Sequence, residues 1–141
     1  MSEGGPRLAG MTAPVPYVLF DGTARAAFTF YQGVFGGELT LHSYADFGRD
    51  DGPADAVAHG YLTGPVAFFG ADAGPSDEPV SVRGLLFSAL GVAEPDELEA
   101  WFAALSEGGR VVDPLQKRPW GAHDGTVTDR YGLTWLIGYE E

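Results

Sequence analysis

The 141-residue chain contains no cysteine, few basic side chains and no apolar run long enough to cross a membrane. Without cysteine, disulfides, thiolate metal ligands and a cysteine nucleophile are excluded. A membrane helix needs about 20 apolar residues, so no membrane partner is expected. Only 8 Lys and Arg face 20 Asp and Glu, a formal net charge of −12. This balance argues against nucleic acid, whose phosphates attract basic side chains. The composition suits a cytoplasmic protein, and a cytoplasmic location is expected.

One spacing pattern occurs twice. The first copy is Ala27, Phe30, Tyr31 and Val34, followed by Gly36-Gly37, and the second is Leu98, Trp101, Phe102 and Leu105, followed by Gly108-Gly109. Both copies follow the i, i+3, i+4, i+7 spacing of one helix face, and both end on glycines, which often stop helices. The repeat predicts two copies of one small α+β unit.

Strand-like segments surround both helices. In the first half the pattern predicts a strand over 15–20, a helix capped by Thr23 and ending near Phe35, and a strand over 38–44. The first half then continues with a long loop over 45–56 and strands over 57–62 and 66–69. The second half repeats this order, with a strand over 84–91, a helix starting at Pro95, a strand from Val111 and a hairpin of 126–128 with 133–139.

The predicted fold class is therefore α+β, with two tandem βαβββ modules. We expect a flexible tail over 1–13 and a single domain over 14–140. Within this domain, module one covers 14–72, an acidic linker covers 73–82, and module two covers 83–140.

Three stretches of the sequence carry a family resemblance. They are residues 15–22 leading into 30–37, residues 58–72, and residues 119–135. With the doubled frame, they resemble the vicinal oxygen chelate superfamily, the group of glyoxalases, bleomycin-resistance proteins and extradiol dioxygenases, and most closely its PhnB-like branch. The resemblance implies that each sheet curls into a half-barrel, that the two halves line a pseudo-symmetric cleft, and that the protein is a homodimer.

The usual metal ligands of this superfamily are missing. Its metalloenzymes carry His, Glu or Gln on the first and fourth strands of each module. Residues 15–20, 65–71, 84–90 and 133–139 contain none of these types, and the first and last ligand positions fall near Pro16 and Leu136. The resemblance thus implies a metal-free protein without a cofactor, and argues against glyoxalase I, dioxygenase and fosfomycin-modifying activities. The alternative is a relocated divalent metal held by His42, His59 or His123.

Two histidines are candidate catalytic or ligand-binding groups. His59 lies on the third predicted strand, on the same face as Tyr61, and a structural role across the sheet is its other interpretation. His123 opens the closing hairpin near Trp120. His42 is expected to be exposed. Asp72 and Asp129 are expected mainly in turns.

An aromatic cleft completes the predicted site. Its expected lining residues, besides His59 and His123, are Tyr17, Phe20, Phe69, Phe87, Trp120 and Trp135, some of which must belong to the core instead. The expected function is binding of a small organic ligand, cationic or aromatic. The alternative is a lyase, isomerase or dioxygenase-like enzyme using His59 or His123.

Overall fold

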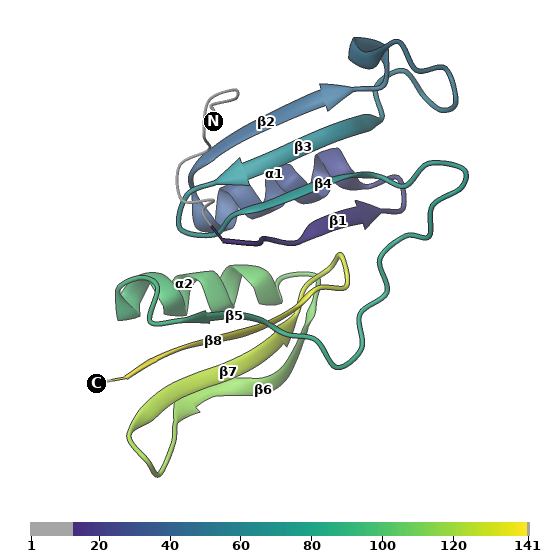
Figure 1. Ribbon diagram of the computed structural model, residues 1–141. Coiled ribbons are helices and arrows are strands. Elements are labelled where there is room, and N and C mark those ends of the chain that lie inside the picture. The colour runs from purple at the N-terminus through teal and green to yellow at the C-terminus, as the bar shows by residue number, and fades with distance from the viewer. Residues whose placement is uncertain (1–12, 141) are drawn as a thin grey trace. The chain divides into compact units, whose positions relative to one another are not determined.

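The computed structural model describes residues 13–140 and divides into two compact units, one ending at Val80 and the other beginning at Ser81 (Figure 1). The tail predicted for residues 1–13 lies, except for Ala13, outside the described residues. Each unit is one helix packed on one four-stranded sheet.

The first unit follows the predicted order. Its elements are β1 (Tyr17–Phe20), α1 (Ala24–Phe35), β2 (Glu38–Ser43), the short 3-10 helix η1 (Ala45–Phe47), β3 (Val57–Thr63) and β4 (Phe68–Asp72). The sheet order is β1-β4-β3-β2, with β1 parallel to β4 and the other neighbours antiparallel.

The second unit repeats this topology. Its elements are β5 (Phe87–Leu90), α2 (Pro95–Ser106), β6 (Arg110–Lys117), β7 (Ala122–Thr128) and β8 (Thr134–Glu140), in the sheet order β5-β8-β7-β6. Here β5 is parallel to β8. The α+β class with two tandem βαβββ modules is thereby confirmed.

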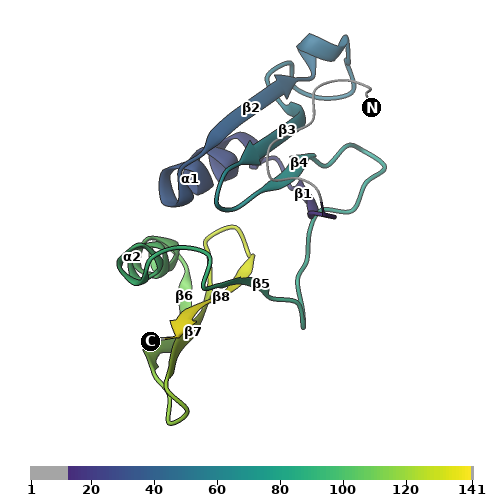
Figure 2. The same cartoon turned by 60° about the vertical axis from the view of Figure 1, so that its left-hand side comes forward.

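Each helix covers one face of its own sheet and leaves the other face free of helices (Figures 1 and 2). In the first unit, Phe28 of α1 is fully buried and stacks on Phe68 with ring centres 5.1 Å apart. A Cβ atom added to Gly60 or Gly70 would lie 3.0–3.1 Å from the Phe28 ring. The two glycines therefore let the helix approach the sheet closely.

The start of α1 differs from the prediction. The side chain of Thr23 makes no capping hydrogen bond. Instead, the backbone N–H of Ala24 donates to the carboxylate of Asp72 at 2.9 Å, and the N–H of Val57 donates to the other oxygen at 2.9 Å. A buried carboxylate 48 residues away in the chain thus replaces the local cap.

No helix of the described residues is long and apolar enough to cross a membrane.

Candidate functional site

The helix-free face of the first sheet carries a cluster of rings. Because Gly60 and Gly70 face Phe28 of α1, their strand neighbours His59, Tyr61 and Phe69 project from the opposite face. Register pairs extend this set, since Tyr17 lies beside Phe69 and His42 beside His59. We define the ring cluster as Tyr17, His42, Phe47, His59, Tyr61 and Phe69.

His59 lies at the centre of the ring cluster. Its ring centre is 5.6 Å from that of Phe69, 5.7 Å from Tyr17, 5.8 Å from Tyr61 and 6.4 Å from His42. Phe47, from η1, stacks on His42 at 5.6 Å. Tyr17 is 49% exposed and Phe47 55% exposed, so the cluster is an accessible aromatic surface rather than a core.

The polar groups of the cluster are coupled. The hydroxyl of Tyr17 lies 3.0 Å from Nδ1 of His59. Burial lowers the pKa of His59, and the nearby charge of His42 lowers it further, since two cations repel. Burial raises the pKa of Tyr17, with a further rise from the negative charge of Asp77. Neutral pH therefore favours an uncharged imidazole beside an uncharged phenol.

This pairing determines what His59 offers a ligand. When the Tyr17 hydroxyl donates to Nδ1, the neutral imidazole carries its proton on Nε2 and presents a hydrogen-bond donor. When Nδ1–H donates to the hydroxyl oxygen, Nε2 is instead an unprotonated acceptor and can act as a base. The tautomer separates a binding role from a catalytic one.

The second sheet carries no equivalent cluster on its helix-free face. Tyr139 bonds Glu99 of α2, which places Tyr139 and its register partner His123 on the helix side, and Asp124 on the other. There the hydroxyls of Thr128 and Thr134 lie 2.8 Å apart. This face is polar where that of the first unit is aromatic.

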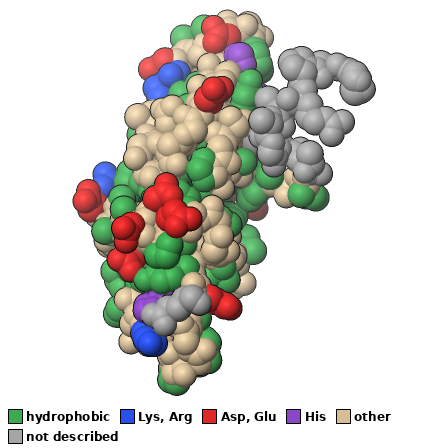
Figure 3. Space-filling view, turned by 90° about the vertical axis from the view of Figure 1, so that its left-hand side faces the viewer, with side chains coloured by type: hydrophobic (Ala, Val, Ile, Leu, Met, Phe, Trp, Pro, Cys, Tyr) green, Lys and Arg blue, Asp and Glu red, His purple; other side chains and the backbone are tan. Residues whose placement is uncertain are grey.

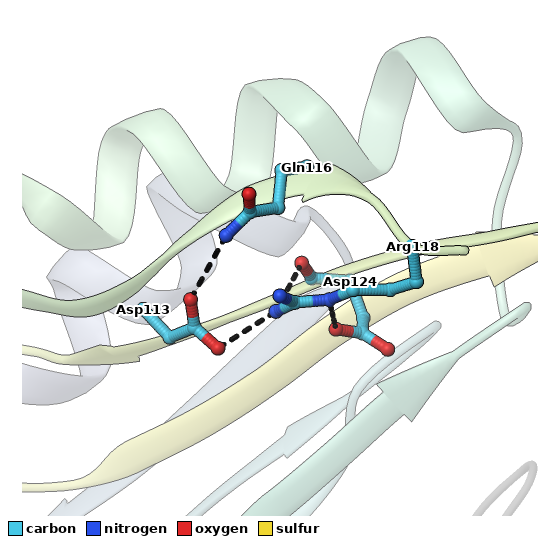
Figure 4. Close-up of polar contacts among 4 residues, drawn as sticks. All are labelled: Asp113, Gln116, Arg118 and Asp124. Atoms are coloured by element: carbon cyan, nitrogen blue, oxygen red, sulfur yellow. Dashed lines mark hydrogen bonds and ion pairs between the residues drawn. The ribbon is translucent and has the colours of Figure 1, made fainter. Parts of the chain in front are cut away.

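Arg118 organises the charged groups of this region (Figure 4). Its Nε donates to Oδ1 of Asp124 at 2.7 Å, and its Nη2 donates to Oδ2 of Asp113, also at 2.7 Å. Gln116 donates to the other oxygen of Asp113 at 3.1 Å. The positive charge of Arg118 therefore offsets part of the negative charge of Asp113 and Asp124. No feature of the sequence indicated this pairing.

Three of the predicted ligand-binding residues, Tyr17, His59 and Phe69, lie together in the ring cluster. Phe20 does not, because its side chain is 1% exposed and packs edge-on against Phe28 on the helix side. Its expected place in the cleft lining is corrected to the core. The short apolar strand of β1 offered no alternation from which to tell its two faces.

The expected aromatic residues of module two are also placed differently. Trp135 is 4% exposed, its Nε1–H donates to Oδ2 of Asp129 at 2.9 Å, and its ring lies 5.2 Å from Phe87 on the same side of the sheet. Trp135 is thus part of the core of the second unit, with Phe87 packed beside it, instead of an exposed lining. Trp120 is 72% exposed, and His123 stacks on Tyr139 at 4.8 Å.

Sequence reasoning missed three members of the ring cluster. Tyr61 was placed on the same face as His59 by strand alternation, and that signal was sufficient to include it. His42 was expected to be exposed, but it is half-buried between Phe47 and His59. Phe47 comes from the predicted loop and had no periodic signal.

No three His, Asp or Glu side chains gather within residues 13–140 in a way that would hold a metal ion. His42 and His59 are neighbours without a third ligand. The carboxylate of Asp72 is occupied by the backbone N–H groups of Ala24 and Val57. The donor set of the ring cluster is therefore a poor fit for a divalent metal, which usually takes three or more protein ligands.

The doubled βαβββ fold defines the class of protein. Residues 13–137 match the model of the Glyoxalase/Bleomycin resistance protein/Dioxygenase superfamily. The chain belongs to this superfamily.

Individual relatives agree with this assignment. The crystal structure of protein PA1353 from Pseudomonas aeruginosa is 34% identical, with a TM-score of 0.75, over 90% of this chain and 96% of that one. A PhnB protein from Bacillus cereus shares the fold at 20% identity, with a TM-score of 0.73, over 89% of this chain and 98% of that one. Protein YjdN of Escherichia coli K12 is 26% identical over 138 residues, 86% of this chain and 91% of YjdN.

Proposed function

We propose that this chain is a metal-free PhnB-like protein that binds a small organic molecule carrying a flat aromatic group. The observation that supports the proposal is the ring cluster, which presents several half-exposed rings around His59 on a sheet face without helices. Each well-placed aromatic pair contributes about 0.5–1.5 kcal/mol in addition to the free energy gained by burying apolar surface. Two or three such contacts would therefore strengthen the binding of a flat aromatic ligand.

The charge of the protein narrows the ligand class. The formal net charge is −12, and the face drawn in Figure 3 carries more acidic than basic side chains. Asp77 also acts on Tyr17 at the cluster itself. A neutral or cationic aromatic ligand is therefore favoured over an anionic one.

The test uses quinoline, a flat neutral probe at pH 8, in calorimetric titration of the full chain. We expect saturable binding that weakens about 2- to 13-fold in Phe69→Leu and in Tyr61→Leu, which keep apolar bulk but remove a ring. Trp120→Ala is the matched control, since it removes an exposed ring outside the cluster. Absence of quinoline binding, or unchanged binding in both cluster variants, would contradict the proposal.

The second candidate is a lyase or isomerase that uses His59 as a general base. The lowered pKa of His59 favours this, because a neutral imidazole is ready to accept a proton at neutral pH. His123 is the weaker candidate, because its ring is stacked on Tyr139 on the helix side of its sheet. Turnover of a bound ligand that is lost in His59→Gln while binding persists would establish the enzyme over the binding protein.

We also propose a homodimer, on the strength of the family resemblance. Sedimentation velocity tests it directly, since the single chain has a mass of 14.9 kDa. Sedimentation of a single 14.9-kDa species at micromolar concentration would contradict the dimer.

A further inference from the structure

The loop between β2 and β3, residues 44–56, is long, and long loops in compact domains are often mobile lids. In this protein the loop is closed on itself, where β2 ends and β3 begins (Figure 1). The N–H of Tyr44 donates to the carbonyl of Ala56 at 2.8 Å, and the N–H of Ala45 donates to the carbonyl of Ala54 at 3.0 Å. These hydrogen bonds join the two ends of the loop.

Reciprocal hydrogen bonds fix the start of the 44–56 loop. Oδ2 of Asp46 accepts the N–H of Ser43 at 2.9 Å, and Oγ of Ser43 accepts the N–H of Asp46 at 3.1 Å. The N–H of Phe47 donates to the carbonyl of Tyr44 at 3.1 Å, within the single turn of η1. Together these bonds hold the backbone that carries Phe47 beside the end of β2.

Arg49 connects this turn to the rest of the loop. Its guanidinium lies over the ring of Tyr44, with Cζ 3.8 Å from the ring centre. The same guanidinium donates two hydrogen bonds to the carboxylate of Asp51, from Nε to Oδ1 at 3.0 Å and from Nη2 to Oδ2 at 2.7 Å. Tyr44 is 2% exposed, so Arg49 stacks on an anchored ring. An arginine that is both stacked and bidentate has a fixed orientation, which a single ion pair does not provide.

Phe47 is the side chain that the loop presents to the ring cluster. Its ring stacks on His42 with ring centres 5.6 Å apart and planes inclined by 20°. His42 in turn lies 6.4 Å from His59, with planes inclined by only 7°. The side chain of Phe47 is 55% exposed, so burial alone does little to hold it in place. Its position beside His42 therefore depends on the backbone of the loop.

We propose that Arg49 is a positioning residue, which holds the 44–56 loop so that Phe47 forms a fixed end wall of the ring cluster. The inference rests on the proposed function, since a fixed wall matters only if the cluster binds a flat ligand. Ordering a free side chain on binding costs conformational entropy, so a ring that is already in place binds its ligand more tightly. The loop is thus a preformed wall of the site and not a lid that closes over it.

The first test needs no ligand and uses NMR of the full chain at pH 8. The ring current of Phe47 should shift the imidazole proton resonances of His42, and Phe47→Leu should remove this shift. Arg49→Met should reduce the shift, because a loosened loop leaves Phe47 beside His42 for only part of the time. The Arg49 side chain is 33% exposed, so this variant is expected to fold. Arg83→Met, which removes an exposed positive charge from the second unit, is the matched control and should leave the His42 resonances unchanged.

The second test is a double-mutant cycle on quinoline binding, measured by calorimetry. Phe47→Leu should weaken binding about 2- to 13-fold, as the loss of one aromatic contact does. Arg49→Met should weaken it about 2- to 5-fold, through the entropy of ordering one side chain. Adding Arg49→Met to Phe47→Leu should cause no further loss, because Arg49 acts through Phe47. Asp51→Asn, which breaks the same contact from the other side, should weaken binding in the same direction as Arg49→Met.

Three outcomes would overturn the proposal: unchanged His42 resonances in Arg49→Met, wild-type quinoline binding in both Arg49→Met and Asp51→Asn, or losses in Arg49→Met and Phe47→Leu that add up in the double variant. If quinoline does not bind the wild-type chain, the proposed function fails. In that case the His42 resonances still decide whether Arg49 holds Phe47 in place, because that measurement uses no ligand.

Discussion

The hydroxyl of Tyr17 lies 3.0 Å from Nδ1 of His59, although β4 separates the strands that carry them. The contact passes over Phe69 of β4, whose ring stacks with Tyr17 at 6.2 Å and with His59 at 5.6 Å. One hydrogen bond and two ring contacts thus join three strands on the helix-free face. The orientation of this bond decides whether His59 presents a donor or a base to a ligand.

The first prediction concerns the protonation of His59. Its pKa should lie below the ordinary value of 6.5, because burial and the charge of His42 both disfavour the cation. His42→Gln removes the like charge and should raise the pKa of His59. Heteronuclear NMR titration of the imidazole measures both values, and the ring nitrogen shifts report the tautomer.

Stability should follow from this shift with a definite sign. A lowered pKa in the folded state means that the unfolded chain binds the His59 proton more tightly, so stability falls as pH drops below about 6.5. His59→Gln should flatten that part of the profile of stability against pH.

The control for His42→Gln is Glu38→Gln, which changes an exposed charge on the same strand, β2. A His59 pKa at or above 6.5 would contradict the prediction.

The second prediction uses two glycines of the first unit. A Cβ atom on Gly70 would lie 2.7 Å from the carbonyl oxygen of Val18 and 3.0 Å from the Phe28 ring, so backbone or helix must move. Gly70→Ala should lower the free energy of unfolding by about 1–3 kcal/mol. Chemical denaturation measures the loss.

Gly33 provides the opposite case in the same unit. It lies inside α1, and an added Cβ atom would meet nothing within 4 Å. Gly33→Ala should raise the free energy of unfolding by roughly 0.5–1 kcal/mol, because alanine loses less backbone entropy in a helix. A stable Gly70→Ala protein, or a destabilised Gly33→Ala protein, would show that the helix-to-sheet packing is described wrongly.

Periodicity is what made much of the fold predictable. The doubled spacing predicted both helices, because the buried face of an amphipathic helix shows as apolar residues three or four positions apart. Helix α1 ends at Phe35, as expected. Alternation along β3 likewise put His59 and Tyr61 on one face. The sequence does not show on which face of the sheet Phe20 lies, because β1 has four largely apolar residues and no polar side.

Most of the remaining errors concern contacts that only tertiary packing creates. Asp72 caps α1 from 48 residues further along the chain, and no local sequence motif predicts this contact. Trp135 is buried in the core and its Nε1–H donates to Asp129, a contact that depends on how the hairpin closes. Phe47 joins the ring cluster through the path of a loop. These features arise from tertiary packing, which a single sequence does not display.

The third prediction concerns Asp129, which is 3% exposed and organises the β7–β8 hairpin. Its Oδ1 accepts the N–H groups of Tyr131 at 2.8 Å and Leu133 at 3.2 Å, and its Oδ2 accepts Nε1–H of Trp135 at 2.9 Å. Asp129→Asn places an amide donor against one of these donors, leaving a buried group unsatisfied.

The expected loss in Asp129→Asn is about 2–4 kcal/mol of unfolding free energy, measured by urea denaturation followed by Trp fluorescence. Asp96→Asn, an exposed carboxylate in the first turn of α2, is the matched control and should change stability by about 0.5 kcal/mol or less. Equal effects of the two substitutions would mean that the hairpin bonds contribute nothing specific.

The fourth prediction concerns Arg118, which lies between the carboxylates of Asp113 and Asp124 (Figure 4). Arg118→Met keeps the aliphatic stem but leaves two acidic groups facing each other in an already acidic protein. We expect a lower denaturation midpoint, most clearly at low ionic strength, because salt screens the repulsion that remains.

Two comparisons make this test specific to the network. The double variant Arg118→Met with Asp124→Asn should recover part of the lost stability, since only one carboxylate then remains without its partner. Arg110→Met, an exposed position on the same strand β6, is the control for losing one positive charge. If Arg110→Met and Arg118→Met shift the midpoint equally, the net charge of the chain rather than the Arg118 contacts controls its stability. If salt has no effect on the Arg118→Met protein, its loss of stability does not come from repulsion between the two carboxylates.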